Sequence, residues 1–142
     1  MKTPFYFLLF KAFHAQRRCI RKDMDAYQLS PGQPKVLRYI SSHDDCKLKD
    51  IALECDIEPA TVSKILNTLE DKGMLTRQID PCNKRALQLR ITETGKVAMA
   101  KWEIHCREVE KIALDGFDDQ EIEQFKAYLG RLYFNLSGKE LK

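Results

Sequence analysis

The chain has 142 residues, of which 44% are hydrophobic and 32% are charged. This length and composition allow one domain with a real hydrophobic core, and six Gly and five Pro residues exclude a collagenous or low-complexity chain. No apolar run approaches the roughly 18 residues of a membrane span, so we expect no membrane association. The net charge of +3 is mildly basic and does not identify a partner by itself.

The first predicted element is an amphipathic helix over residues 5–28. Its apolar run is interrupted by Lys11, and basic residues follow, so a secretory signal is not expected. The five cysteines form no CxxC pair, which favours reduced thiols in the cytoplasm. The sequence contains no metal-ligand cluster, phosphate-binding loop or nucleophile motif. We therefore expect neither an enzyme nor a bound metal or cofactor.

Short helices are predicted next along the chain. Ser30 is the expected N-cap of the second helix, with Pro31 at its first position and Gln33 as the capping-box partner. This helix ends near His43, and a polar break over 41–46 follows. Two further helices are predicted over 47–55 and 59–72, the latter ending at Gly73.

The hydrophobic period then changes from 3.6 to 2, which predicts a β-hairpin. The expected strands cover residues 75–79 and 87–91, and a polar, turn-rich loop with basic residues joins them. A long helix over 92–114 follows. Asp118 and Glu121 form a capping-box pattern that begins the last helix. The predicted fold class is mainly α with a small β-hairpin.

Residues 47–75 have the pattern of a helix-turn-helix. Asp56 can adopt the left-handed conformation of the turn, and the small Ala52 lets the two helices cross closely. The second helix would enter a DNA major groove with small, hydroxyl, amide or basic side chains that suit base edges and phosphates. These candidates are Pro59, Ala60, Thr61, Ser63, Lys64 and Asn67.

A helical hairpin with a merely solvated face is the alternative interpretation of 47–75. The basic hairpin that follows favours a winged helix-turn-helix instead, because a wing with arginine at its tip suits a narrow minor groove. The candidate DNA-contacting residues of the hairpin are Arg77, Asn83, Lys84 and Arg85.

These segments resemble the MarR/SlyA family of bacterial transcription regulators. The resemblance rests on LSPGQPKVLRYI, on IALECDIEPATVSKILNTLEDKGML and on the wing segment DPCNKRALQLRITETG. In the family's wing an aspartate precedes the tip arginines, whereas this chain has Asn83 there. The family's base-reading position falls on Lys64, and its minor-groove arginine falls on Arg85.

The resemblance implies a homodimer that binds a pseudo-palindromic operator in double-stranded DNA. It divides the chain into an N-terminal dimerisation helix (1–28), a winged helix-turn-helix lobe (29–95) and C-terminal dimerisation helices (96–142). Wide apolar stripes on the first and last predicted helices favour a dimer independently.

The resemblance also implies a repressor released by a small lipophilic or phenolic ligand, in a cleft to which Phe13, Tyr39 and His43 could contribute. Two alternatives stay open: a winged-helix module that binds protein and not DNA, and a thiol-responsive regulator. The cysteine nearest the family's sensing position is Cys19, and Cys82 lies on the wing.

Overall fold

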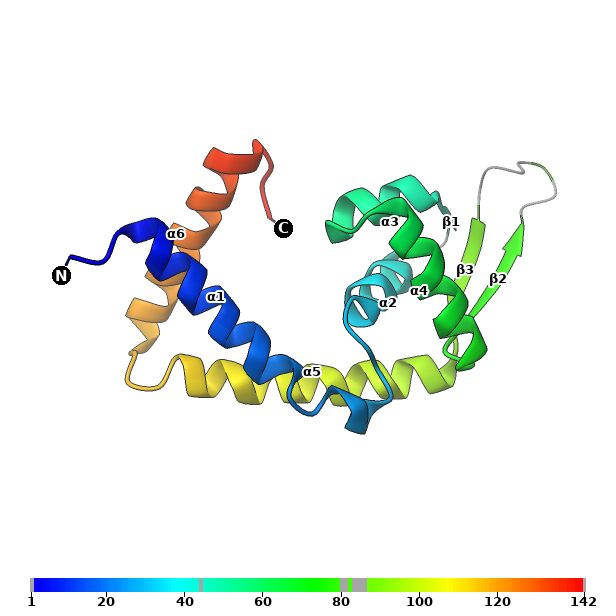
Figure 1. Cartoon of the computed structure of the whole chain (residues 1–142), viewed down its shortest axis with the longest axis horizontal. Helices are drawn as coiled ribbons and strands as arrows, with labels where there is room; N and C mark the ends of the chain where they lie inside the picture. The colour runs from blue at the N-terminus through cyan, green and yellow to red at the C-terminus, as the bar shows by residue number, and fades with distance from the viewer. Residues whose placement is uncertain (1, 44, 80–81, 83–86, 142) are drawn as a thin grey trace. The chain divides into compact units, whose positions relative to one another are not determined.

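The computed structural model describes residues 2–43, 45–79, 82 and 87–141 (Figure 1). The chain divides into two compact units, Met1–Arg107 and Glu108–Lys142. In the described residues, no helix is both long enough and apolar enough to cross a bilayer.

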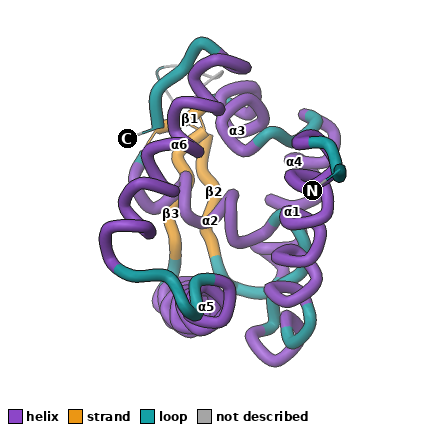
Figure 2. The backbone as a smooth tube through the Cα atoms, turned by 90° about the vertical axis from the view of Figure 1, so that its left-hand side faces the viewer, coloured by secondary structure: helices purple, strands orange, loops and turns teal. Residues whose placement is uncertain are grey.

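The first unit contains a cluster of short helices beside a small antiparallel sheet. Its elements are α1 (Phe5–Arg21), the 3₁₀ helix η1 (Met24–Tyr27), α2 (Gln33–Ser42), β1 (Asp45–Cys46), α3 (Leu48–Cys55), α4 (Pro59–Asp71), β2 (Leu75–Ile79), β3 (Leu87–Ile91) and the first part of α5 (Glu93–Ala113). The strands lie side by side in the order β1-β3-β2 (Figure 2). Arg77 is opposite Leu89 in the β2–β3 register. The predicted mainly α fold with a β-hairpin is confirmed.

The core of this unit lies among α2, α3, α4 and the sheet, whose elements contact one another. Apolar side chains spaced at helical intervals on α4 and at alternate positions on the strands point into it. The largest fully buried side chains are Leu29, Val36, Leu37, Ile51, Val62, Leu66, Leu69, Met74, Leu75 and Leu89.

The first helix is shorter than predicted. It ends at Arg21, and the chain then turns through η1 instead of remaining α-helical to residue 28. Gln28 takes a left-handed conformation with φ 58°, which no continuous helix allows. The turn brings Met24 and Leu29 into the core, where both are buried. Burial of these two side chains therefore prevails over the local helical pattern.

The predicted N-cap of the second helix is wrong. Helix α2 begins at Gln33 after Gly32, whose φ of 87° places it outside any helix, and Pro34 occupies the first turn. The expected side-chain contact is nevertheless present, because the Ser30 backbone N–H donates to the Gln33 Oε1 atom at 2.9 Å. The capping partner was predicted correctly, but the glycine moves the start of the helix.

The polar break predicted over 41–46 contains a strand that the sequence pattern missed. In β1, Asp45 pairs with Gln88 and Cys46 pairs with Leu87. A two-residue strand is too short to show a period of two, so only the neighbouring β3 defines it. The other predicted boundaries agree with the structure to within one residue.

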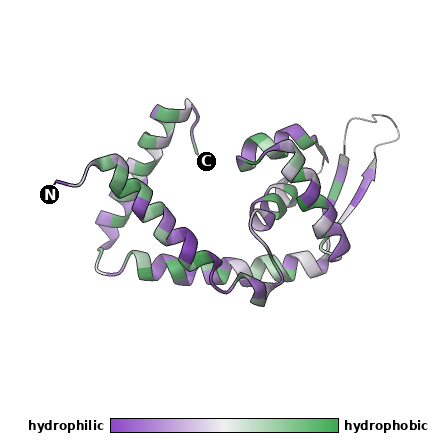
Figure 3. Cartoon of the chain, in the orientation of Figure 1, coloured by the Kyte–Doolittle hydropathy of each residue, from purple (hydrophilic) through white to green (hydrophobic). Residues whose placement is uncertain are grey.

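The second unit contains the end of α5 and helix α6 (Asp119–Ser137). The Asp118 side chain accepts a hydrogen bond from the Glu121 backbone N–H at 2.8 Å, and the Glu121 carboxylate accepts one from the Asp118 N–H at 2.9 Å. This confirms the predicted capping box. Neither α1 nor α6 has a buried residue. Hydrophobic residues are prominent on both helices (Figure 3), so each exposes an apolar surface.

Candidate nucleic-acid interface

Helices α3 and α4 form the predicted helix-turn-helix. Asp56 ends α3 in the left-handed conformation, with φ 54°, and the Ile57 N–H donates to the Ala52 carbonyl oxygen at 3.0 Å. Ala52 is itself buried. Helix α4 begins immediately afterwards, with Pro59 in its first turn.

Helix α4 has one buried face and one accessible face. Val62, Ile65, Leu66 and Leu69 are buried against the core. The six residues predicted to read DNA all retain solvent access: Pro59, Ala60, Thr61, Lys64 and Asn67 are exposed, and Ser63 is partly exposed. Among the described residues, the Lys64 side chain forms no hydrogen bond or ion pair, so its ammonium is available to a ligand.

The C-terminal end of α4 is anchored by a lysine that sequence reasoning missed. Lys72 Nζ donates to the Gln28 carbonyl oxygen and to Gln33 Oε1, both at 2.9 Å. Gln33 is only 3% exposed, so this polar group is satisfied inside the unit. The sequence pattern indicated Gln33 only as a capping partner and gave no sign of its contact with Lys72. The contacts tie α4 to the segment between η1 and α2.

Arg77 lies on β2, on the same face of the strand as the buried Leu75, and reaches back to α4. Its Nη2 atom lies 2.7 Å from Asn67 Oδ1 and 3.3 Å from Glu70 Oε1. The guanidinium is therefore paired within the protein, which the sequence did not reveal. Two of the predicted interface residues, Asn67 and Arg77, are thus in direct contact.

The other predicted interface residues belong to the tip of the hairpin. Asn83, Lys84 and Arg85 lie outside the described residues. The two strands that lead to the tip are described, and the neighbouring Cys82 is exposed.

The three residues suggested for a ligand cleft occupy two places in the first unit. Phe13 is exposed on α1, with the Arg17 guanidinium 5.4 Å from its ring centroid. Tyr39 and His43 stack on each other at the end of α2, with ring centroids 4.0 Å apart and an interplanar angle of 9°. Burial, together with the nearby Cys46 and Asp50, raises the pKa of Tyr39. Tyr39 therefore remains a neutral hydrogen-bonding group.

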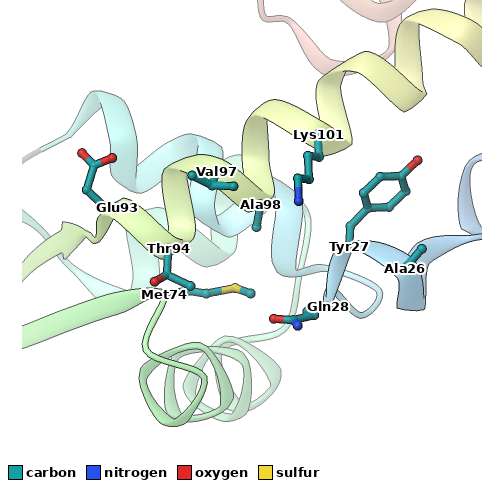
Figure 4. A pocket seen from close by; sticks show the side chains of 9 residues that line it. All are labelled: Ala26, Tyr27, Gln28, Met74, Glu93, Thr94, Val97, Ala98 and Lys101. Atoms are coloured by element: carbon teal, nitrogen blue, oxygen red, sulfur yellow. The ribbon is translucent and has the colours of Figure 1, made fainter.

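A separate cavity of about 370 Å³ lies in the first unit, beside the start of α5 (Figure 4). Apolar side chains of Met74, Val97 and Ala98 line it, and the Lys101 side chain extends toward them. Its remaining lining residues are Ala26, Tyr27, Gln28, Glu93 and Thr94. An apolar wall with a nearby ammonium is chemically suited to a small amphipathic anion. No cluster of potential metal ligands occurs among the described residues.

A helix-turn-helix followed directly by an antiparallel hairpin defines a winged helix-turn-helix domain. The known proteins similar to this chain agree with that class. Residues 29–87 match the model of the MarR family. The chain is 28% identical over 93 residues to the HTH-type transcriptional regulator BilQ of Clostridioides difficile. The alignment covers 61% of this chain and 63% of BilQ.

Solved structures show the same fold over almost the whole chain. The transcriptional regulator SlyA superposes with a TM-score of 0.84 at 24% identity and covers 96% of both chains. BpsR of Bordetella bronchiseptica, in a structure that concerns regulation of its DNA binding by 6-hydroxynicotinic acid, has a TM-score of 0.76 at 19% identity and covers 89% of this chain and 96% of BpsR. The sequence matches span less than two thirds of the length of the curated relatives. Residues 29–87 are therefore similar to the MarR family.

Proposed function

We propose that this protein is a transcriptional regulator that binds specific DNA sequences as a homodimer. The observation that carries the proposal is the accessible polar face of α4, opposite a buried apolar face. A helix presented in this way can enter the major groove, where Lys64 donates to guanine O6 or N7 and the hydroxyls of Thr61 and Ser63 contact phosphates or bases. In the same proposal, Asn83, Lys84 and Arg85 of the wing contact the neighbouring minor groove.

The dimer is supported by apolar surface that each unit exposes. On α1, Phe5 is 65% exposed and Phe10 and Phe13 are about half exposed; on α6, the exposed side chains include Tyr128 and Leu136. Aromatic surface of this extent is costly in water and marks an association site. We propose that α1 and the C-terminal helices of two copies cover it, so that two α4 helices reach half-sites about one helical turn apart.

The test is a binding titration on a DNA site selected from a random library with the full chain. We expect the protein to bind the selected site more tightly than a scrambled duplex, and to bind both less tightly as salt increases. Lys64→Ala should weaken binding to the selected site more than binding to the scrambled duplex. Lys139→Ala, which removes the same charge from the second unit, is the control and should bind like the wild type. Equal affinity for selected and scrambled DNA would refute sequence-specific binding and favour a protein-interaction module.

We further propose that the regulator is a repressor released by a small lipophilic or phenolic anion. The cavity beside Lys101 supports this because its size and its apolar wall suit one aromatic ring with a carboxylate or phenolate. The regulation of BpsR by an aromatic acid is consistent with the same chemistry. Phe13, Tyr39 and His43 do not line this cavity. Tyr39 and His43, which stack on each other away from Phe13, remain a second candidate position.

Two substitutions distinguish these positions. If the anion binds beside Lys101, Lys101→Gln should weaken ligand-induced release from DNA and Tyr39→Ala should not. If it binds at the half-buried Tyr39 and its stacked neighbour His43, the effects should be reversed. Thermal shift with a panel of aromatic acids, followed by DNA release, provides the measurement. A panel that neither stabilises the protein nor releases DNA would contradict effector control by this class of ligand.

A further inference from the structure

The accessible face of α4 has a centre line that the helical period defines. Successive residues of an α-helix are rotated by about 100°. The side chains of α4 that are buried are those of Val62, Ile65, Leu66 and Leu69. The residues opposite the middle of this buried face, all of them exposed, are Ala60, Lys64, Asn67 and Asp71. Ala60 is therefore the first residue of α4 whose side chain points directly away from the core.

The first turn of α4 offers mainly apolar groups to a partner. Pro59 and Ala60 have no polar side-chain atom, and Thr61 has a methyl group beside its hydroxyl. All three are exposed, and residues 59–62 include no charged residue. The N-terminal residues of a recognition helix are the ones that contact base edges. The apolar group that distinguishes a base in the major groove is the 5-methyl group of thymine.

We propose that Ala60 is a specificity-determining residue that selects thymine through contact between two methyl groups; this rests on the DNA binding proposed above. Ala60 lies four residues before Lys64, which is about 6 Å along a helix that rises 1.5 Å per residue. Base pairs are about 3.4 Å apart, so the thymine lies within about two base pairs of the base that Lys64 contacts. Thr61 and Ser63 lie on opposite sides of the centre line, where the phosphate backbones border the groove.

Replacement of thymine by deoxyuridine tests the contact, because it removes only the 5-methyl group. Each thymine of the selected site is replaced in turn, and binding by the full chain is titrated. For the wild type, one replacement in each half-site should lower the affinity about fourfold, which corresponds to one buried methyl group. For Ala60→Gly the same replacement should have no effect, because the protein methyl group is absent. The two affinities are compared within one variant, so a general loss of helix stability cancels from their ratio.

Thr61→Ser is the matched control. It removes the other exposed methyl group of the first turn and keeps the hydroxyl, so it should retain the thymine-to-deoxyuridine ratio of the wild type. Circular dichroism monitors whether each variant is folded. The position of the sensitive thymine is compared with that of the guanine whose preference over adenine is lost in Lys64→Ala.

Three results would overturn the inference. The first is a selected site in which no thymine is sensitive to deoxyuridine, which would mean that Ala60 only leaves room for the groove. The second is a ratio that persists in Ala60→Gly, and its loss in Thr61→Ser would identify Thr61 as the partner. The third is a sensitive thymine more than about two base pairs from the guanine that depends on Lys64. Failure of the wild type to distinguish selected from scrambled DNA is a separate outcome, which refutes the proposed function itself.

Discussion

Gly95 provides a direct test of how the hairpin joins α5. A Cβ atom on this residue would lie 2.3 Å from the Met74 carbonyl oxygen and 2.8 Å from Ile91 Cγ1. The carbonyl cannot easily move away, because it accepts the Thr92 backbone N–H at 3.0 Å. The Thr92 hydroxyl in turn accepts the Gly95 N–H at 3.2 Å. Gly95→Ala must therefore separate the start of α5 from the beginning of β2.

The magnitude follows from two opposing effects. Overpacking against a constrained neighbour costs about 1–3 kcal/mol, and a contact with backbone places this site toward the upper end. Replacing a helical glycine by alanine returns at most about 1 kcal/mol. We expect Gly95→Ala to lower the free energy of unfolding by about 1–2 kcal/mol, equivalent to a few degrees in Tm at roughly 3 °C per kcal/mol.

Urea unfolding followed by circular dichroism measures this change. Lys96→Ala, at the neighbouring exposed position, is the matched control. Its ion pair with Glu93 is on the surface and should contribute less than about 0.5 kcal/mol. A Gly95→Ala protein as stable as wild type would show that α5 can shift without cost. This result would refute the argument that the close approach of Gly95 to Met74 determines how the hairpin joins α5.

Five further outcomes are expected. Lys64→Ala should cost about 1–3 kcal/mol on the selected DNA site and much less on random DNA; equal losses on both would make Lys64 a phosphate contact, as a competition titration would show. Deleting residues 1–28 should give monomers or aggregates in light scattering, and a soluble truncated dimer would contradict the proposed interface. Burial raises the pKa of the Cys46 and Cys55 thiols, so they should be alkylated at higher pH in the native protein than in the unfolded chain. The same two thiols ionise at lower pH in the unfolded chain, so the free energy of unfolding should fall as pH increases above about 8.5. A free energy of unfolding that is constant through this range would argue against these pKa shifts. An effector that binds the free dimer more tightly than the DNA-bound dimer should lower the affinity for DNA by the same factor. Calorimetry of effector binding with and without DNA tests this equality.

Local sequence patterns were sufficient for most of the fold. The helical period of α4, the alternation in β2 and β3, the left-handed turn at Asp56 and the Asp118 capping box depend on residues close together in the chain, and the structure agrees with each. The accessible face of α4 was also predictable, because a helix that buries Val62, Ile65, Leu66 and Leu69 must expose the residues between them. Candidate reading positions therefore follow from the sequence alone.

Contacts between distant residues required the tertiary structure. The α1 helix ends early because Met24 and Leu29 enter a core formed by later elements. Strand β1 exists because β3 provides its hydrogen bonds, and Lys72 reaches residues 39 and 44 positions earlier. The same applies to Asn67: its exposure was evident from the helical period, but the direction of its amide is determined by Arg77, which a separate strand brings within 2.7 Å. Periodicity identifies which face a side chain occupies, whereas hydrogen-bond direction depends on the partner that folding places beside it.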